Sequence, residues 1–244
     1  MNKTRGRGFS GLALSAVVCA SYWLLADNYR AYRLVRRTGN KLFHRNEEVQ
    51  EEPALAADAV VIEGFRHSGN SFLVGNVAPS DIHRVHSHSH RAFALREAVE
   101  SSVPTVVMIR DPLEAALSLR HRSHSADVMA WGVRFTAFTA LVCWLGYYRS
   151  VWKLRRGITF VQMEDMAVDC RAVFAKVSAA TGLSFKEETS YATRHRFDGA
   201  RPEQNLSWAS RLVLAQARRL HASICAYPEA AHAETRMTPA LATV

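Results

Sequence analysis

The stretch IEGFRHSGNSFLVGN, residues 62–76, joins an apolar strand end, a basic turn rich in glycine and serine, and the start of a helix. Chains use this order to hold a phosphate, because backbone N–H groups at a helix start can point at an anion. Gly69 permits close approach of the backbone, and Arg66 and His67 add positive charge. The Gly-Lys-Ser/Thr ending of a nucleoside triphosphate loop is missing. A helix capped by a serine or asparagine, with nothing bound, gives the same pattern.

A second stretch, TVVMIRDPLEAALSLRHR at residues 105–122, indicates another position for a ligand. Its apolar strand delivers Arg110 to the C-terminal edge of the sheet, where open α/β sheets bind ligands. Asp111-Pro112 ends the strand and starts a helix, and Ser118 follows on that helix. An arginine and a helix hydroxyl can hold a second phosphate, apart from the first loop. An aspartate that caps the helix beside a surface arginine is the alternative.

Strand and helix patterns alternate along the chain from residue 58 onward, which predicts an α/β domain with a mostly parallel sheet flanked by helices. The strands are expected at 59–65, 82–88, 105–110 and 158–163. The helices are expected at 71–78, 91–101, 112–122, 127–154 and 165–181. Within one of these, the apolar stretch 131–152 resembles a membrane span. Arg134 and Arg149 bracket only 14 uncharged residues, however, so a buried amphipathic helix is favoured.

Charge and cysteine content exclude several classes of protein. The net charge is +9 over 244 residues, and residues 1–46 carry +8 of it. The rest of the chain is close to neutral and has no basic stripe, which argues against binding nucleic acid. The four cysteines are far apart and show no CxxC spacing, so a disulfide framework or a cysteine metal site is not expected.

The N-terminal segment predicts a membrane attachment. A basic tail, 1–8, precedes the uncharged run FSGLALSAVVCASYWLLA at 9–26, which has the length and interfacial aromatics of a transmembrane signal-anchor. A cleaved signal peptide and an apolar helix packed on the domain are the alternatives. Residues 27–57 are typical of a basic amphipathic stretch and an acidic stem. We therefore expect a single-pass membrane protein, of Golgi type if eukaryotic and of the inner membrane if bacterial. The domain would span 58–228, with a C-terminal tail at 229–244.

Together the two phosphate-binding stretches resemble the sulfotransferase family, whose members transfer a sulfuryl group from 3′-phosphoadenosine 5′-phosphosulfate (PAPS). The family's 5′-phosphosulfate loop is similar to Phe65-Arg66-His67-Ser68-Gly69-Asn70-Ser71-Phe72. Its 3′-phosphate motif has a strand ending in arginine, then Asp/Asn-Pro, and a serine eight residues after the arginine. That motif is similar to Arg110, Asp111, Pro112 and Ser118. VQMEDM, with Glu164 and Asp165, looks like the family's acidic segment after the fourth strand. The resemblance spans residues 59–185.

This resemblance implies a P-loop NTPase-like sulfotransferase fold and a set of site residues. The 5′-phosphosulfate would be held by Arg66, His67, Ser68, Gly69, Asn70, Ser71 and Phe72. The 3′-phosphate would be held by Arg110 and Ser118. His88, which closes the second strand after His86-Ser87, would be the general base. His67 stands where the family commonly has Lys or Arg, and we expect it to take part in catalysis too.

The predicted reaction transfers the sulfuryl group of PAPS to a hydroxyl or amine of an acceptor. The desulfated donor, PAP, is the second product. By analogy with phosphoryl transfer, positioning and cationic stabilisation suffice and no metal is required. The stem and anchor suit a glycan or a lipid-linked alcohol as acceptor. His86, His88 and His90 alternate as in a metal site, but no carboxylate or cysteine accompanies them at ligand spacing. Asp111 and Glu164-Asp165 are interpreted as structural.

Two other functions stay open from the residues. A P-loop nucleoside kinase or ATPase would need a lysine after Gly69 and an acidic strand end for Mg²⁺, and neither is evident. A membrane-tethered protein that binds a nucleotide without turning it over is consistent with a histidine at position 67.

Overall fold

The computed structural model describes residues 55–87, 89–123, 135–187 and 202–227. Its centre is a four-stranded sheet in which every neighbouring pair is parallel, in the order β2-β1-β3-β4. The strands are β1 (Val60–Gly64), β2 (Val85–Ser87), β3 (Thr105–Ile109) and β4 (Thr159–Gln162). The predicted α/β class with a parallel sheet is confirmed, and all four strands lie within their predicted ranges.

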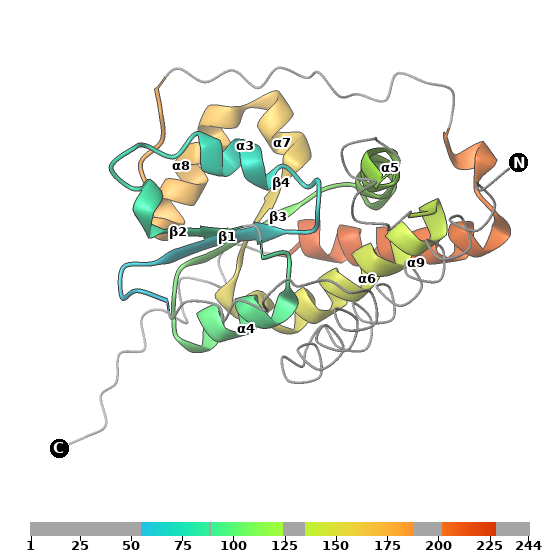
Figure 1. The fold of residues 1–244 in the computed structure, drawn as a ribbon, viewed down its shortest axis with the longest axis horizontal. Coiled ribbons are helices and arrows are strands. Elements are labelled where there is room, and N and C mark those ends of the chain that lie inside the picture. The colour runs from blue at the N-terminus through green and yellow to red at the C-terminus, as the bar shows by residue number, and fades with distance from the viewer. Residues whose placement is uncertain (1–54, 88, 124–134, 188–201, 228–244) are drawn as a thin grey trace, which may run out of the picture.

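Helices cover both faces of the sheet (Figure 1). One face carries α3 (Asn70–Gly75), α7 (Met163–Val168) and α8 (Cys170–Thr181). The other carries α4 (Ala92–Glu100), α6 (Ala137–Lys153) and α9 (Trp208–Cys225), with α5 (Pro112–Ser123) beside them. The two central strands, β1 and β3, therefore have no solvent face, which explains why they read as nearly continuous apolar runs.

Alternate residues of each strand enter two separate hydrophobic cores. In β1, Val60 and Ile62 pack with α3 and α8, whereas Val61 packs with α4 and α6. In β3, Met108 likewise packs in the core with α3 and α8, and Ile109 packs in the core with α4 and α6. This two-residue period fixes the register, because a slip by one residue would exchange the two cores.

The chain departs in opposite directions from the two central strands. After β1 it passes through α3 to β2 on one side, and after β3 it passes through α5 and α6 to β4 on the other. The carboxyl ends of β1 and β3 therefore flank a switch point, the position at which open α/β sheets bind ligands.

Several helix predictions need correction. Helix α3 ends at Gly75 and not at 78, and α6 begins at Ala137 because Thr136 is extended and caps it. The helix expected at 165–181 is two helices, because Asp169 adopts an extended conformation and its side chain caps α8 by accepting the N–H groups of Arg171 and Ala172. Helix α9 was not predicted, although Ser207 caps its start. Its apolar side, with Leu214, contributes to the core below the sheet.

The described part of the apolar stretch 131–152 forms a buried helix, as its flanking arginines favour. Helix α6 starts at Ala137 with a capping box from Thr136 and Thr139, and the whole of its middle is buried in the core. Within the described parts of the chain, no helix is both long and apolar enough to cross a membrane. The predicted anchor at 9–26 and the tail at 229–244 lie outside the described residues.

Candidate functional site

The loop between β1 and α3, residues 65–69, has two residues in the left-handed backbone region. φ is 66° at His67 and 94° at Gly69. Glycine adopts a positive φ readily, whereas the Cβ of a histidine makes it unfavourable. A Cβ on Gly69 would lie no closer than 3.4 Å to the side chains of Met108 and Met163, so glycine is required there by conformation rather than by space. Strained backbone of this kind is typical of ligand-binding loops.

The hydroxyl of Tyr148, on α6, holds this loop from inside the protein. It donates to Met108 O of β3 at 2.6 Å and accepts the N–H of Phe65 at 3.3 Å. Ser68 Oγ lies 3.4 Å from the same oxygen, and both side chains are buried. Because the tyrosine proton is used on Met108 O, Ser68 is the donor in its contact with Tyr148. The Ser68 hydroxyl therefore faces the core.

Arg110 follows β3 directly and connects the two stretches that resemble phosphate motifs. Its Nη1 donates to the carbonyl oxygen of His67 at 3.1 Å, across 43 residues of chain. Its Nε and Nη2 donate to Glu114 Oε2 of α5 at 3.3 and 3.1 Å. Arg110 is only 5% exposed, while the Glu114 side chain is 51% exposed. The two stretches therefore meet at the switch point, with the guanidinium engaged by protein oxygens.

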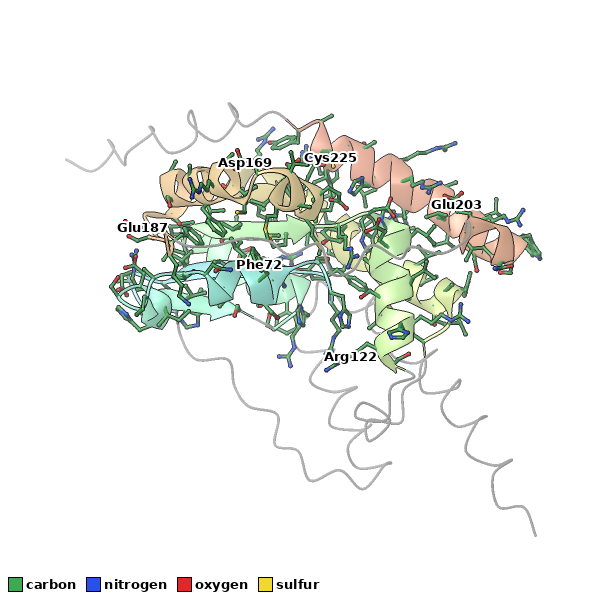
Figure 2. The ribbon with its side chains drawn as sticks, turned by 90° about the horizontal axis from the view of Figure 1, so that it is seen from above. Phe72, Arg122, Asp169, Glu187, Glu203 and Cys225 are labelled. Carbon is green, nitrogen blue, oxygen red and sulfur yellow. The ribbon has the colours of Figure 1, made fainter. Side chains whose placement is uncertain are left out.

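The imidazole of His67 lies in positively charged surroundings. Its pKa is lowered from the ordinary 6.5 to about 4, first by burial and then by the charges of Arg66, Arg122 and Arg110. Arg122 lies at the C-terminal end of α5 (Figure 2). His67 is therefore neutral at pH 7, and the arginines supply the positive charge of the loop. Clustered positive charge beside a partly buried loop attracts anions.

Asn70, the first residue of α3, is tied to the end of β1. Its Nδ2 donates to Gly64 O at 3.3 Å, and its Oδ1 is buried without a hydrogen-bond partner among the described atoms. A Cβ on Gly64 would lie 2.5 Å from Met108 O and 2.7 Å from Asn70 Oδ1, so only glycine fits between these groups. A buried acceptor without a partner costs stability, and it marks a place for a donor from water or a ligand.

The remaining predicted ligand residues differ in exposure. Arg66 and Ser71 are exposed, the first in the loop and the second in the first turn of α3. Phe72 is half-buried, and its ring stacks on Phe174 of α8 with centroids 6.4 Å apart. Its side chain therefore belongs to the core on that face of the sheet. Ser118 is half-buried on α5.

The turn after β2 is held by an acidic residue of β1. His88, the predicted base, lies outside the described residues. The next two residues, Ser89 and His90, donate their backbone N–H groups to the two carboxylate oxygens of Glu63 at 2.6 and 3.1 Å. His90 Nδ1 lies 2.9 Å from Gly64 O and 3.7 Å from Glu63 Oε2. A carbonyl oxygen can only accept, so Nδ1 carries a proton in this arrangement.

Glu63, like Tyr148, belongs to the site but was not predicted from the sequence. It is 1% exposed, and burial raises its pKa from the ordinary 4.5 to about 7, against the opposing effect of the N–H groups of Ser89 and His90. The signal for it was present, since a single acidic residue interrupts the apolar strand AVVIEGF. An acidic side chain that is fully buried in a parallel sheet needs partners of its own.

Asp111 and Glu164 have the structural roles expected of them. Asp111 Oδ1 accepts the N–H groups of Leu113 and Glu114 at 2.9 and 3.0 Å and so caps α5. Glu164 Oε1 in turn accepts the N–H of Asp111 at 2.9 Å, which ties the end of β4 to the end of β3. These bonds fix the backbone that follows Arg110.

No protein-family model matches the chain, and a search of curated proteins finds no match. Across the described ranges, no group of three or more histidine, cysteine, aspartate or glutamate side chains is placed to hold a metal ion. The residues of the site form a cationic, strained loop joined to a buried arginine at the switch point.

Proposed function

We propose that this chain is a PAPS-dependent sulfotransferase, whose domain at 58–228 moves a sulfuryl group from PAPS to a hydroxyl or amine of an acceptor. The observation that carries the proposal is the hydrogen bond from Arg110 Nη1 to His67 O. It joins the two stretches that resemble the family's 5′-phosphosulfate and 3′-phosphate motifs. It lies at the switch point, where ligand binding is expected in a parallel sheet.

The residues at this edge fit a nucleotide with two anionic ends. Arg66, Arg110 and Arg122 are all close enough to depress the pKa of His67. An anion in the loop would reverse part of that effect, because a nearby negative charge favours the imidazolium. Arg110 would have to turn from Glu114 toward a phosphate. The exchange is feasible because the Glu114 carboxylate is half-exposed, so water can solvate it once the buried guanidinium bonds a phosphate instead.

Bound PAPS would supply the sulfuryl group, whose transfer by in-line displacement requires stabilisation of charge on the peripheral oxygens. In this proposal the β1–α3 loop, with Arg66 and His67, orients the 5′ end and stabilises that charge. Arg110 and Ser118 hold the 3′ end. His88 accepts the proton of the acceptor hydroxyl. The chain's own task is therefore positioning, electrostatic stabilisation and one proton transfer.

The proposed setting is a membrane surface. An anchor at 9–26 followed by a stem would keep the domain within reach of membrane-bound acceptors, which favours a glycan or a lipid-linked alcohol as substrate. The protein would then be a single-pass membrane enzyme.

The proposal is tested by following the conversion of PAPS to PAP by the full-length protein in detergent, with oligosaccharides and lipid-linked alcohols as acceptors and without divalent cations. We expect PAP to form only when an acceptor is present. His88→Ala should reduce the rate about 100-fold or more, the usual effect of losing a general base, while binding of PAP persists. Turnover of ATP that depends on magnesium would instead support the kinase. Binding of PAP without transfer to any acceptor would support a protein that only binds the nucleotide.

A further inference from the structure

We infer that Tyr148 is a positioning residue for the β1–α3 loop, and through this loop for the 5′-phosphosulfate end of the donor. The inference rests on the proposed function. Its basis is the set of three hydrogen bonds at one buried hydroxyl, which joins α6, the loop and β3. Tyr148 lies 80 residues or more from the loop in sequence, so no motif in the sequence includes it.

The hydroxyl of Tyr148 uses its full hydrogen-bonding capacity. Its proton goes to Met108 O, and its two lone pairs accept from Phe65 N–H and Ser68 Oγ–H. Phe65 is the first residue of the loop and Ser68 the fourth, so the hydroxyl fixes both positions to the neighbouring strand. The groups are buried, so water is not at hand to replace a bond that is lost.

Packing fixes the position of this hydroxyl. The ring centroid of Tyr148 lies 4.4 Å from that of Trp144 and 5.0 Å from that of Tyr147, which it meets edge-on. All three side chains are fully buried. Burial also raises the pKa of Tyr148 far above its ordinary value, so the phenol keeps its proton at every working pH. Both ends of the Phe65–Ser68 turn are therefore held by a rigid neutral group on a core helix, beside the bond from Arg110 to His67 O.

This arrangement makes the two ends of the nucleotide respond differently to loss of the hydroxyl. His67 and Gly69, with their positive φ angles, adjoin the fixed Ser68, so the backbone that would face the 5′ end depends on Tyr148. Ser118, which would hold the 3′ end, is placed by α5. Arg110 bonds the loop through His67 O, but it follows β3 directly and is also held by two bonds to Glu114 of α5. Removal of the hydroxyl should therefore weaken binding of the 5′ end selectively.

The test is calorimetric titration of the full-length protein with PAP and with adenosine 3′-monophosphate, which lacks the 5′ phosphate. We expect Tyr148→Phe to weaken the binding of PAP about fivefold or more, which is the effect of one lost hydrogen bond. The affinity for adenosine 3′-monophosphate should change by less than about twofold. Tyr147→Phe is the matched control. It removes an equally buried hydroxyl one residue away and keeps the ring packed 6.1 Å from Phe65, so it should leave both affinities unchanged.

Ser68→Ala is the second variant, and it carries the test if Tyr148→Phe does not fold. It removes the donor to Tyr148, so we expect the same selective loss of affinity for PAP. The variant that carries both substitutions should bind PAP no more weakly than Tyr148→Phe alone, because both act through one hydrogen bond. Equal affinities for the two tyrosine variants, or an equal loss for both nucleotides, would overturn the role of Tyr148. If the wild-type protein binds neither nucleotide, the proposed function itself fails and the role of Tyr148 fails with it.

Discussion

Arg110 directs two of its nitrogens, Nε and Nη2, at a single carboxylate oxygen, Glu114 Oε2, at 3.3 and 3.1 Å. In the proposed function this carboxylate occupies the guanidinium that would hold the 3′-phosphate. Glu114→Gln should therefore tighten binding of PAP about two- to fivefold, in line with the strength of a half-exposed ion pair. Calorimetry measures the change. Glu97→Gln, which removes one exposed negative charge from α4, is the control and should leave the affinity unchanged. Weaker binding by Glu114→Gln would show that the carboxylate supports Arg110 instead of competing for it.

The pKa of His67 should rise when an anion binds in the loop. In the free protein its pKa of about 4 leaves it neutral at pH 7, and a phosphate group close to the ring would raise that pKa. An NMR titration of the imidazole, with the resonance assigned from His67→Gln, should show the increase on addition of PAP. A pKa near 6.5 in the free protein would contradict the combined effect of burial and the three arginines.

Glu63 should make the stability of the protein depend on pH in an unusual direction. With a pKa raised to about 7, the folded state keeps a proton that the unfolded state has already released above pH 4.5. The free energy of unfolding should therefore fall as the pH rises from 4.5 to 7, by up to about 3 kcal/mol. Urea unfolding of wild type and Glu63→Gln at several pH values isolates this contribution, since His67 titrates equally in both. Parallel curves for the two proteins would refute it.

Gly64 should tolerate no side chain. A Cβ would meet the backbone oxygen Met108 O at 2.5 Å, and backbone in the centre of a sheet cannot move aside without loss of strand pairing. Gly64→Ala should lower the free energy of unfolding by about 2 kcal/mol or more. Gly75→Ala is the matched control, because a Cβ at this helical position meets nothing within 4 Å. It should be neutral or slightly stabilising. Equal melting temperatures for the two variants would contradict the close approach at Gly64.

The strands and the two phosphate-like stretches could be predicted from sequence because each depends on local pattern. Apart from Glu63 and Thr105, β1 and β3 are apolar, since both of their faces are buried, and the Gly and Asp-Pro signals mark where each strand ends. The carboxyl ends of parallel strands share one edge, so both stretches were expected at that edge. The contact of Arg110 with His67 depends on β1 and β3 being neighbours, and no strand order was predicted.

The contacts that position the loop could not be predicted in the same way. Tyr148 reads as one more apolar residue of a core helix, and only the fold brings its hydroxyl to Phe65, 83 residues earlier. The partners of Glu63 lie in a turn 26 and 27 residues later, and no periodicity connects them. Helix α9 was missed because arginines interrupt its apolar residues, and its burial depends on packing against α6, which lies far away in the sequence.

The most direct test of the central claim is calorimetric binding of PAP to the full-length protein without magnesium, with ATP as the comparison and Arg110→Ala as the variant. We predict that PAP binds, that ATP binds much more weakly, and that Arg110→Ala loses about 2 kcal/mol or more of binding free energy, as expected for a charge-assisted contact to phosphate. Equal binding of PAP and ATP, with no effect of Arg110→Ala, would contradict the proposal of a PAPS site at the switch point.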